Sequence, residues 1–135
     1  MSDTAAPPVE SDVVTKLSAH SVTDTVSSLT ALLGAKGMKV FAVIDQSAEA
    51  GAVGLDLRPT VLVIFGNPTG GTAIMDAAPL AALDLPLKIL VWADGGQTRV
   101  SYLAPSTLAD RYGLDPSLAR NLEGIEPLID AVVSP

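Results

Sequence analysis

The stretch Arg58–Lys88 reads RPTVLVIFGNPTGGTAIMDAAPLAALDLPLK, and it decides the fold. Its apolar run, Thr60–Phe65, is apolar on both faces, as a central strand would be. The run ends at Gly66-Asn67-Pro68, a turn sequence, and two further glycines lead into a short helix predicted over Thr72–Ala78. A Leu-Pro step then precedes a second strand, predicted over Leu87–Ala93. The stretch therefore predicts strands of one sheet joined by a helix.

The spacing of apolar residues predicts the other elements. Over Ser21–Gly37 apolar residues recur every three or four positions, which is typical of an amphipathic helix. The motif Asp94-Gly95-Gly96 predicts a hairpin between two strands. Further strands are expected at 14–21, 39–45 and 98–103, and helices at 47–54, 105–112 and 115–129. The sequence thus predicts a single compact α+β domain, a small mixed sheet with helices packed against it, in the order β-α-β-(α)-β-α-β-β-α.

Composition sets limits on the class of protein. The chain has 135 residues, enough for one domain with a real core, which we place at 13–135. Residues 1–12 are small, acidic and contain two prolines, so a disordered N-terminal tail is expected there. The net charge of −7 and the scattered basic residues argue against binding to nucleic acid or to an anionic membrane. No cysteine is present, which excludes thiolate chemistry and is compatible with a cytoplasmic protein.

The turn after the central strand is the first candidate site. A strand end, glycines and a helix N-terminus can together present backbone N–H groups to a carboxylate or phosphate. We expect Asn67 to orient this turn, and Gly71 to keep its backbone open. The alternative is a purely structural turn in which Thr72 is the N-cap of the helix. No Gly-Lys-Ser/Thr follows, so the segment is not a P-loop.

Charged residues at strand ends form the second candidate set. Asp45 can act as a general base if it is desolvated, and Arg58 can hold a carboxylate in a bidentate fork. Asp84 lies just before the strand that carries Lys88. The alternative is that these groups form structural ion pairs at the margin of the sheet.

Two further residue types are weaker candidates. His20 is the only histidine, and a metal site or triad would need partners that the sequence does not identify. We expect it to be exposed or to take part in capping the first long helix. Phe65, Trp92 and Tyr102 can wall an apolar pocket, although packing in the core or in a dimer interface is the favoured interpretation.

The motifs of the opening stretch resemble those of the domain of unknown function 302 family. The resemblance covers roughly residues 22–114 and is carried by Phe65-Gly66-Asn67-Pro68, by Gly71-Thr72, and by Asp84-Leu85-Pro86-Leu87-Lys88 leading to Trp92. It implies a compact α+β domain with a layer of helices against a small mixed sheet. It also implies a homodimer. It implies no particular reaction.

The chain departs from the family pattern at three positions. Where many members carry histidine after the aspartate that ends the second strand, this chain has Gln46. Where many have Arg-His-Gly-Leu, it has Tyr112 in place of the histidine, and Val61 stands where a polar residue is common. Any metal or haem ligands that those histidines supply are missing here, so we expect no cofactor and no metal.

Three functional hypotheses follow. The first is a soluble domain that binds a small molecule or anion near the Gly-Asn-Pro turn as a homodimer. The second is a metal-free enzyme that uses Asp45 as base and Arg58 as substrate clamp, and the third is a purely structural interaction module. The residues expected to bind a ligand are Asp45, Arg58, Asn67, Gly71, Thr72 and Asp84.

Overall fold

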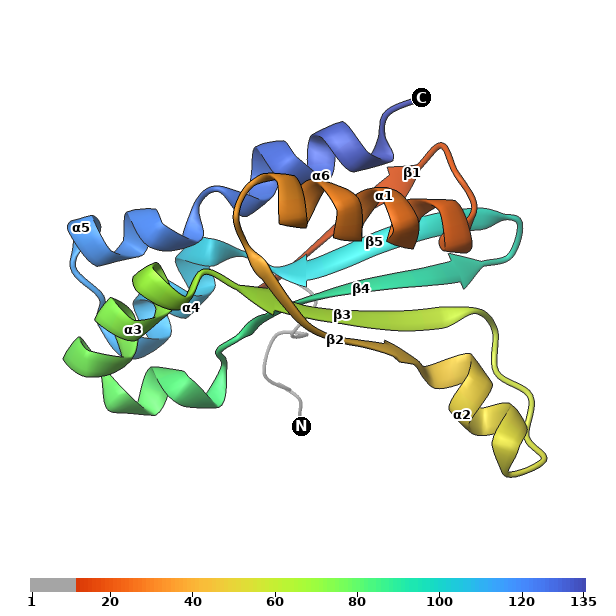
Figure 1. The fold of residues 1–135 in the computed structure, drawn as a ribbon, viewed down its shortest axis with the longest axis horizontal. Helices are drawn as coiled ribbons and strands as arrows, with labels where there is room; N and C mark the ends of the chain where they lie inside the picture. Colours follow the sequence, from red (N-terminus) through yellow and green to blue (C-terminus); the bar gives the residue numbers. More distant parts are fainter. Residues whose placement is uncertain (1–11) are drawn as a thin grey trace, which may run out of the picture.

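Five strands form one sheet in the order β1-β5-β4-β3-β2 (Figure 1). The computed structural model describes residues 12–135. The strands are β1 (Val13–Ser18), β2 (Lys39–Asp45), β3 (Thr60–Gly66), β4 (Leu87–Asp94) and β5 (Gln97–Leu103). Every neighbouring pair of strands is antiparallel. The prediction of a mixed sheet was therefore wrong. The reason is that the helix after β3 packs beyond the end of the sheet rather than crossing its face, so β4 starts where β3 ends.

The helices occupy three places around the sheet. The helices α1 (Val22–Ala35) and α6 (Ile125–Val133) lie side by side over one face. A second group, which we call the end group, gathers at the end of the sheet where β3 stops. The helix α2 (Gln46–Ala52) projects from the opposite end (Figure 1). The end group comprises α3 (Pro68–Ala77), η2 (Pro79–Leu83), α4 (Pro105–Tyr112), α5 (Pro116–Ala119) and η3 (Arg120–Leu122). The predicted α+β class, with helices packed against a sheet, is confirmed.

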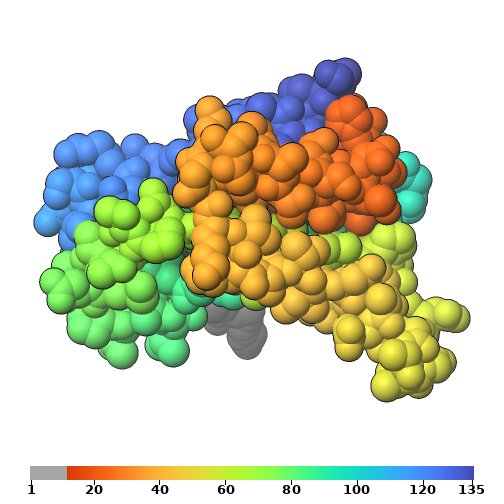
Figure 2. Space-filling view, in the orientation of Figure 1, coloured from red at the N-terminus to blue at the C-terminus, as the bar shows by residue number. Residues whose placement is uncertain are grey.

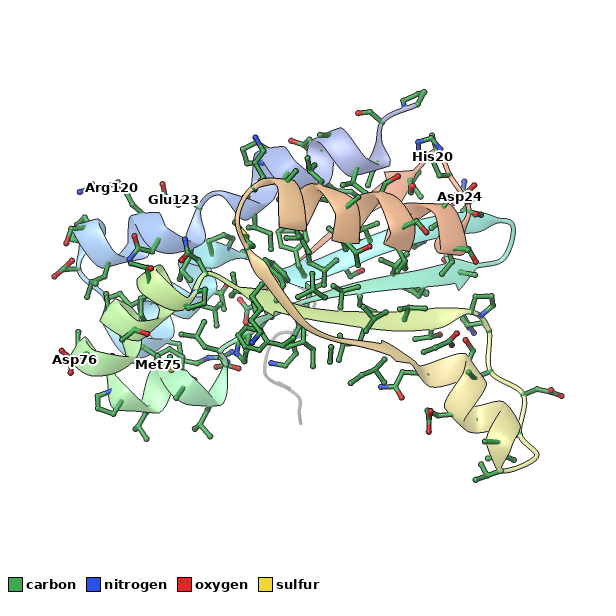
Figure 3. All side chains as sticks on the ribbon, viewed as in Figure 1. His20, Asp24, Met75, Asp76, Arg120 and Glu123 are labelled. Atoms are coloured by element: carbon green, nitrogen blue, oxygen red, sulfur yellow. The ribbon has the colours of Figure 1, made fainter. Side chains whose placement is uncertain are left out.

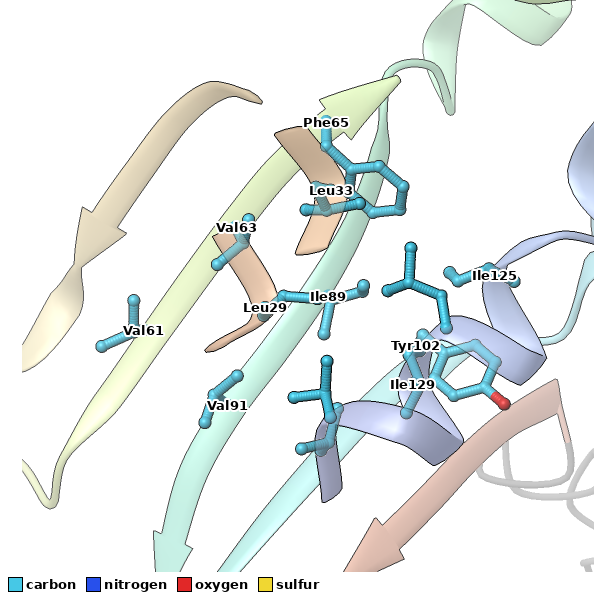
Figure 4. Packing of buried hydrophobic residues seen from close by; sticks show 13 residues of the cluster. Leu29, Leu33, Val61, Val63, Phe65, Ile89, Val91, Tyr102, Ile125 and Ile129 are labelled. Carbon is cyan, nitrogen blue, oxygen red and sulfur yellow. The ribbon is translucent and has the colours of Figure 1, made fainter. Parts of the chain in front are cut away.

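The main core lies between the sheet and its two covering helices (Figure 4). Alternate residues of β3, namely Val61, Val63 and Phe65, point into it and are buried. Leu33 of α1 and Ile129 of α6 meet them from the helix layer, both without exposed surface. Alternation with period two along β3 and period three to four along α1 therefore produces the same packed interior.

A smaller apolar cluster holds the helices at the end of the sheet. It joins Ile74 of α3, Ala81 of η2, Leu108 of α4 and Leu122 of η3. Leu87, at the start of β4, packs against both this cluster and the main core. The end group is therefore fixed to the sheet, which gives the surfaces between them a defined geometry.

Element boundaries differ from the predictions where capping decides them. The first strand ends at Ser18, before Ser21 caps α1 by accepting a bond from the backbone of Asp24. The single last helix predicted over 115–129 is divided into α5, η3 and α6, and Gly124 precedes α6. Of the predicted tail, only Asp12 lies within the described residues, and its carbonyl accepts a bond of 3.0 Å from the Ala104 N–H. The rest of the tail lies outside them.

Candidate functional site

A cavity of about 320 Å³ lies beside the Gly-Asn-Pro turn, between the end of the sheet and α3. In Figure 2, the green surface of α3 adjoins the orange surface of β2 at this end of the molecule. Most of the wall is apolar and comes from Phe41, Pro68, Ile74, Met75, Leu85, Pro86, Leu87 and Leu122. The polar side chains of the wall are Asn67, Thr72 and Asn121. An apolar pocket with a few polar groups is the usual form of a small-molecule site.

Asn67 forms one corner of the cavity and caps α3. Its Oδ1 accepts bonds from the backbone N–H of Thr69 at 3.0 Å and of Gly70 at 3.4 Å. Pro68 at the first helical position has no N–H to satisfy. The first free amides of the helix are thus bonded to Asn67 itself, which leaves fewer of them for an external anion.

Thr72 is not the N-cap that the structural alternative assumed. It lies inside α3, and its hydroxyl donates a bond of 2.6 Å to the carbonyl of Pro68. The predicted start of the helix at Thr72 was wrong, because α3 begins at Pro68. Asparagine followed by proline is the better start signal, since the side chain caps while the ring fixes the first helical φ.

Gly71 leaves room in the cavity wall. A Cβ at this position would lie 4.0 Å from the Met75 methyl group, with no closer atom from elsewhere in the structure. Figure 3 labels Met75 on the same helix. A larger side chain at position 71 would therefore project into open space and take up cavity volume. The structure thus brings three of the six predicted residues, Asn67, Gly71 and Thr72, to one cavity.

Asp45 and Arg58 do not lie at this cavity. The register places Asp45 opposite Val61, at the other end of β2 from Gly66. Its Oδ1 accepts bonds from the Ser47 hydroxyl at 2.6 Å and the Ala48 N–H at 2.9 Å, which lower the pKa of the Asp45 carboxyl. An exposed carboxylate with a lowered pKa is a weak general base.

Arg58 meets an acid near the same end of the sheet. Its Nη1 lies 3.9 Å from an oxygen of Asp94, a pair whose side chains are both well exposed. Asp94 also accepts a shorter bond, 2.9 Å, from the Arg99 Nε. This arrangement matches the structural alternative for Arg58, in which it pairs with an acid at the margin of the sheet.

Asp84 belongs to a third location, at the end of η2. It accepts hydrogen bonds from the Tyr112 hydroxyl and, at 2.8 Å, from Arg111 Nη1. The Tyr112 bond, followed by the Arg111 contact, lowers the pKa of the Asp84 carboxyl. Asp84 and Lys88 border a second, smaller cavity of about 240 Å³. The ion-pair partner of Asp84 is Arg111. The structural alternative had instead paired Asp84 with Lys88.

The sequence analysis did not single out Phe41 and Asn121, which line the cavity beside the Gly-Asn-Pro turn. Phe41 enters from β2, at a register shift between Val40 and Ala42. Asn121 enters from η3 and lies against α3, where a Cβ on Gly70 would be 3.4 Å from its own Cβ. No local pattern points to Asn121, because it reaches α3 only through packing of the end group.

The remaining candidates lie elsewhere. Phe65 and Tyr102 are buried in the main core, whereas the Trp92 indole donates a bond of 3.0 Å to the Ser101 hydroxyl. None of the three lines the cavity beside the Gly-Asn-Pro turn. A His20 ring nitrogen is 2.7 Å from the carbonyl oxygen of Ser134, close to the C-terminus (Figure 3). Within residues 12–135 no three His, Asp or Glu side chains are grouped as metal ligands would be.

Comparisons with known proteins connect this geometry to relatives. A family model described as "Domain of unknown function DUF302" matches residues 14–132. A crystal structure of an uncharacterized conserved DUF302 protein from Bacillus stearothermophilus has a TM-score of 0.76 at 23% identity, covering 90% of this chain and 95% of that one. This similarity establishes the fold.

Curated relatives carry another name. "Fluoride-specific ion channel FluC 1" of Brucella suis is 41% identical over 107 residues, which is 78% of this chain but 42% of that protein. The protein of the same name from Brucella abortus is 41% identical over 107 residues, and the match covers 40% of that protein. This chain therefore spans about two fifths of these relatives. Among the described residues, no helix has the length and hydropathy needed to span a bilayer.

Proposed function

The chain belongs to the family described as domain of unknown function DUF302, and from this premise we propose that it binds a small molecule in the cavity beside the Gly-Asn-Pro turn. The observation that carries the proposal is the cavity itself. Its volume, about 320 Å³, falls at the lower end of the range for ligand pockets. Its wall combines an apolar surface with the side-chain amides of Asn67 and Asn121.

The wall favours a compact, largely apolar ligand with one or two neutral polar groups. No Lys, Arg or His is among the described residues that line the cavity, so an anion would find no countercharge there. The chain as a whole carries −7, which also opposes anions. The two asparagine amides offer both donors and acceptors, and these suit a carbonyl, hydroxyl or amide group of the ligand. We therefore favour a neutral ligand over the carboxylate or phosphate that the turn alone indicated.

The test uses a library of neutral fragments observed by ligand-detected NMR. Gly71→Leu should abolish binding of any hit, because the new side chain fills the cavity from a position with free space around it. Gly34→Leu is the matched control: it is also a helical glycine, on α1, with no atom within 4 Å of its Cβ position. Hits that bind both variants equally, or no hit on the wild type, would contradict the proposal.

The geometry gives less support to an enzyme built on Asp45 and Arg58. Their described contacts are with Ser47, Ala48 and Asp94, and neither lies at the cavity. The structural interaction module remains the alternative if no fragment binds. We also propose that the protein is a cytoplasmic homodimer. Phe41 and Val43, exposed on β2 to 47% and 48%, support the dimer, and the absence of cysteine supports the location.

The curated relatives support a second candidate, in which the domain acts together with a fluoride channel. Its basis is the 41% identity to proteins named as fluoride-specific ion channels, of which this chain matches about two fifths. The test is co-expression of this chain with the unmatched part of the Brucella suis protein. Co-purification in detergent in a stoichiometric ratio would support the association, and separate elution of the two would contradict it.

A further inference from the structure

Exposed apolar side chains are concentrated along one margin of the molecule. Within residues 12–135, eight large hydrophobic side chains are exposed, and five of them lie on β2 or on the segment that follows α2. These five are Phe41, Val43, Val53, Leu55 and Leu57. We propose that this margin, which we call the β2 edge, receives the β2 edge of a second copy about a two-fold axis. The inference rests on the homodimer proposed above and assigns its surface.

The β2 edge is open in a way that the other edge of the sheet is not. Among the described strands, β2 pairs only with β3. On the opposite edge, β1 carries Lys16 near its middle, 2.5 Å from Asp130 and 3.7 Å from Glu126. A charge in the middle of an edge strand opposes pairing with another strand, and proteins commonly use lysine in this way. On β2 the charges stand only at the two ends.

The sequence of β2 is self-complementary. It reads Lys-Val-Phe-Ala-Val-Ile-Asp, so an antiparallel copy centred on Ala42 brings Lys39 to the end of the partner's strand that carries Asp45. The same arrangement brings Phe41 beside the partner's Val43. Opposite charges and aromatic with β-branched residues are both stabilising cross-strand pairs. Each contact occurs twice, because a two-fold interface repeats every pair.

The available side-chain atoms fit this arrangement. Both described bonds to the Asp45 carboxylate go to Oδ1, which leaves Oδ2 for a further partner. The Lys39 amine lies 5.1 Å from the ring of Phe41 and makes no ion pair with another described residue. The register shift between Val40 and Ala42 makes Phe41 the extra residue of a bulge. Side-chain packing around Phe41 therefore contributes more to the contact than a regular main-chain ladder.

This pairing would bring a second copy to the cavity. Because Lys39 is paired with Gly66 in the sheet, the partner's Asp45 would lie near the end of β2 where the cavity opens. The partner's α2 starts directly after its Asp45. The apolar residues that follow, Val53, Leu55 and Leu57, would then be carried toward the cavity of the first copy. Phe41 would contact both the ligand and the partner, so ligand binding and dimerisation would be coupled.

Size-exclusion chromatography with light scattering at micromolar concentration tests the surface. The wild type should elute at about twice the chain mass of 13.8 kDa. Val43→Lys should be monomeric, with the dissociation constant raised about tenfold or more. Leu17→Lys is the matched control on β1, because Leu17 is exposed to 53% and Val43 to 48%, and it should remain a dimer. Circular dichroism checks that both variants are folded.

A charge exchange provides the sharper test. Lys39→Glu and Asp45→Lys should each weaken self-association, because each places like charges opposite one another. Mixed together they should form a heterodimer, in which both cross-strand pairs are again opposite in sign. Asp45→Lys also loses the α2 cap, but no residue of α2 is buried, so the domain should keep its fold.

The outcomes separate the interface from the homodimer itself. A monomeric wild type would overturn both. If the wild type is a dimer, three results would overturn the β2 edge alone. These are a dimer that persists in Val43→Lys, a dimer that is lost in Leu17→Lys, and two charge variants that do not associate when mixed. These measurements are made on the protein without added ligand, and Gly71→Leu tests the proposed ligand site separately.

Discussion

The hydroxyl of Tyr112 donates a hydrogen bond to the Oδ2 atom of Asp84 and thereby joins the last turn of α4 to the end of η2. Arg111 donates to the same oxygen at 2.8 Å. These bonds stabilise the ionised carboxylate, so they lower the pKa of Asp84, and the same bond raises the pKa of the Tyr112 hydroxyl. Tyr112 stands where the family resemblance implied histidine. In this chain that position holds the end group together.

Replacing Tyr112 by Phe should remove the main cause of the lowered Asp84 pKa. A carboxyl whose pKa is lowered by folding stabilises the protein above its unfolded pKa, and this contribution is lost as the pH falls through the folded value. The wild type should therefore be more stable than the variant at about pH 7, and the difference should shrink as the pH is lowered into the acid range, below the ordinary carboxyl pKa of about 4. Urea unfolding at neutral and acid pH measures it.

Asp84→Asn serves as the control for this pH dependence. In that background, Tyr112→Phe should have a similar effect at both pH values, because the titrating group is gone. A stability difference between wild type and Tyr112→Phe that stays constant from neutral to acid pH would contradict the role of the carboxylate.

The second tyrosine should titrate abnormally late. Tyr102 is buried, and this burial together with its bond to Glu126 at 2.5 Å raises the pKa of its hydroxyl to about 12. The chain has two tyrosines, so Tyr112→Phe leaves Tyr102 alone. The absorbance of tyrosinate in that variant should rise with a midpoint near pH 12 when the protein is folded, and near about pH 10 in urea.

The same shift has a consequence for stability in alkali. Because folding raises the pKa of Tyr102, its contribution is present below about pH 10 and is lost as the pH rises toward the folded value. A folded-state midpoint close to that of free tyrosine would show that the Tyr102 hydroxyl is accessible to water.

The sequence predicted strands and helices well where the pattern is local. The predicted strand Lys39–Asp45 agrees to the residue with β2, because β-branched residues end there at an aspartate that caps α2. The predicted strand Thr60–Phe65 likewise lies within β3, and Phe65, for which packing was the favoured interpretation, is buried in the core. These features depend on residues that are close together in the sequence, so they can be predicted from the sequence alone.

The candidate site was predicted only in part, because the sheet is antiparallel. Six residues at or near strand ends were expected to bind a ligand, yet in an antiparallel sheet successive strand ends alternate between the two ends of the sheet. Asp45 ends β2 at one end of the sheet, and Asn67 follows β3 at the other. Asn121 was missed for a related reason: only long-range packing of the end group brings η3 to α3.

Loss of the Asn67 cap should destabilise the domain. Asn67→Ala removes the acceptor for the Thr69 and Gly70 amides, and a lost N-cap costs about 1 kcal/mol. For a domain of this size the Tm should fall by about 3–5 °C. Asn67→Asp is the control, since it keeps the acceptor and adds a charge that suits the helix N-terminus, and its Tm should stay near that of the wild type. Equal losses in both variants would show that the amide nitrogen, and not the cap, is what matters.

Gly71→Ala should stabilise the protein. Gly71 lies inside α3, and an added Cβ meets only the Met75 methyl at 4.0 Å, so alanine gains helix propensity without a clash. The expected gain is about 0.5–1 kcal/mol in the free energy of unfolding, measured by urea denaturation. Gly113→Ala is the opposite case: Gly113 ends α4 at φ +61°, where a Cβ is strained whatever the space, and a loss of about 1 kcal/mol is expected. If Gly71→Ala were destabilising while Gly113→Ala behaved as expected, the space beside Gly71 would not be open, and the cavity would lose the feature on which the proposed ligand site depends.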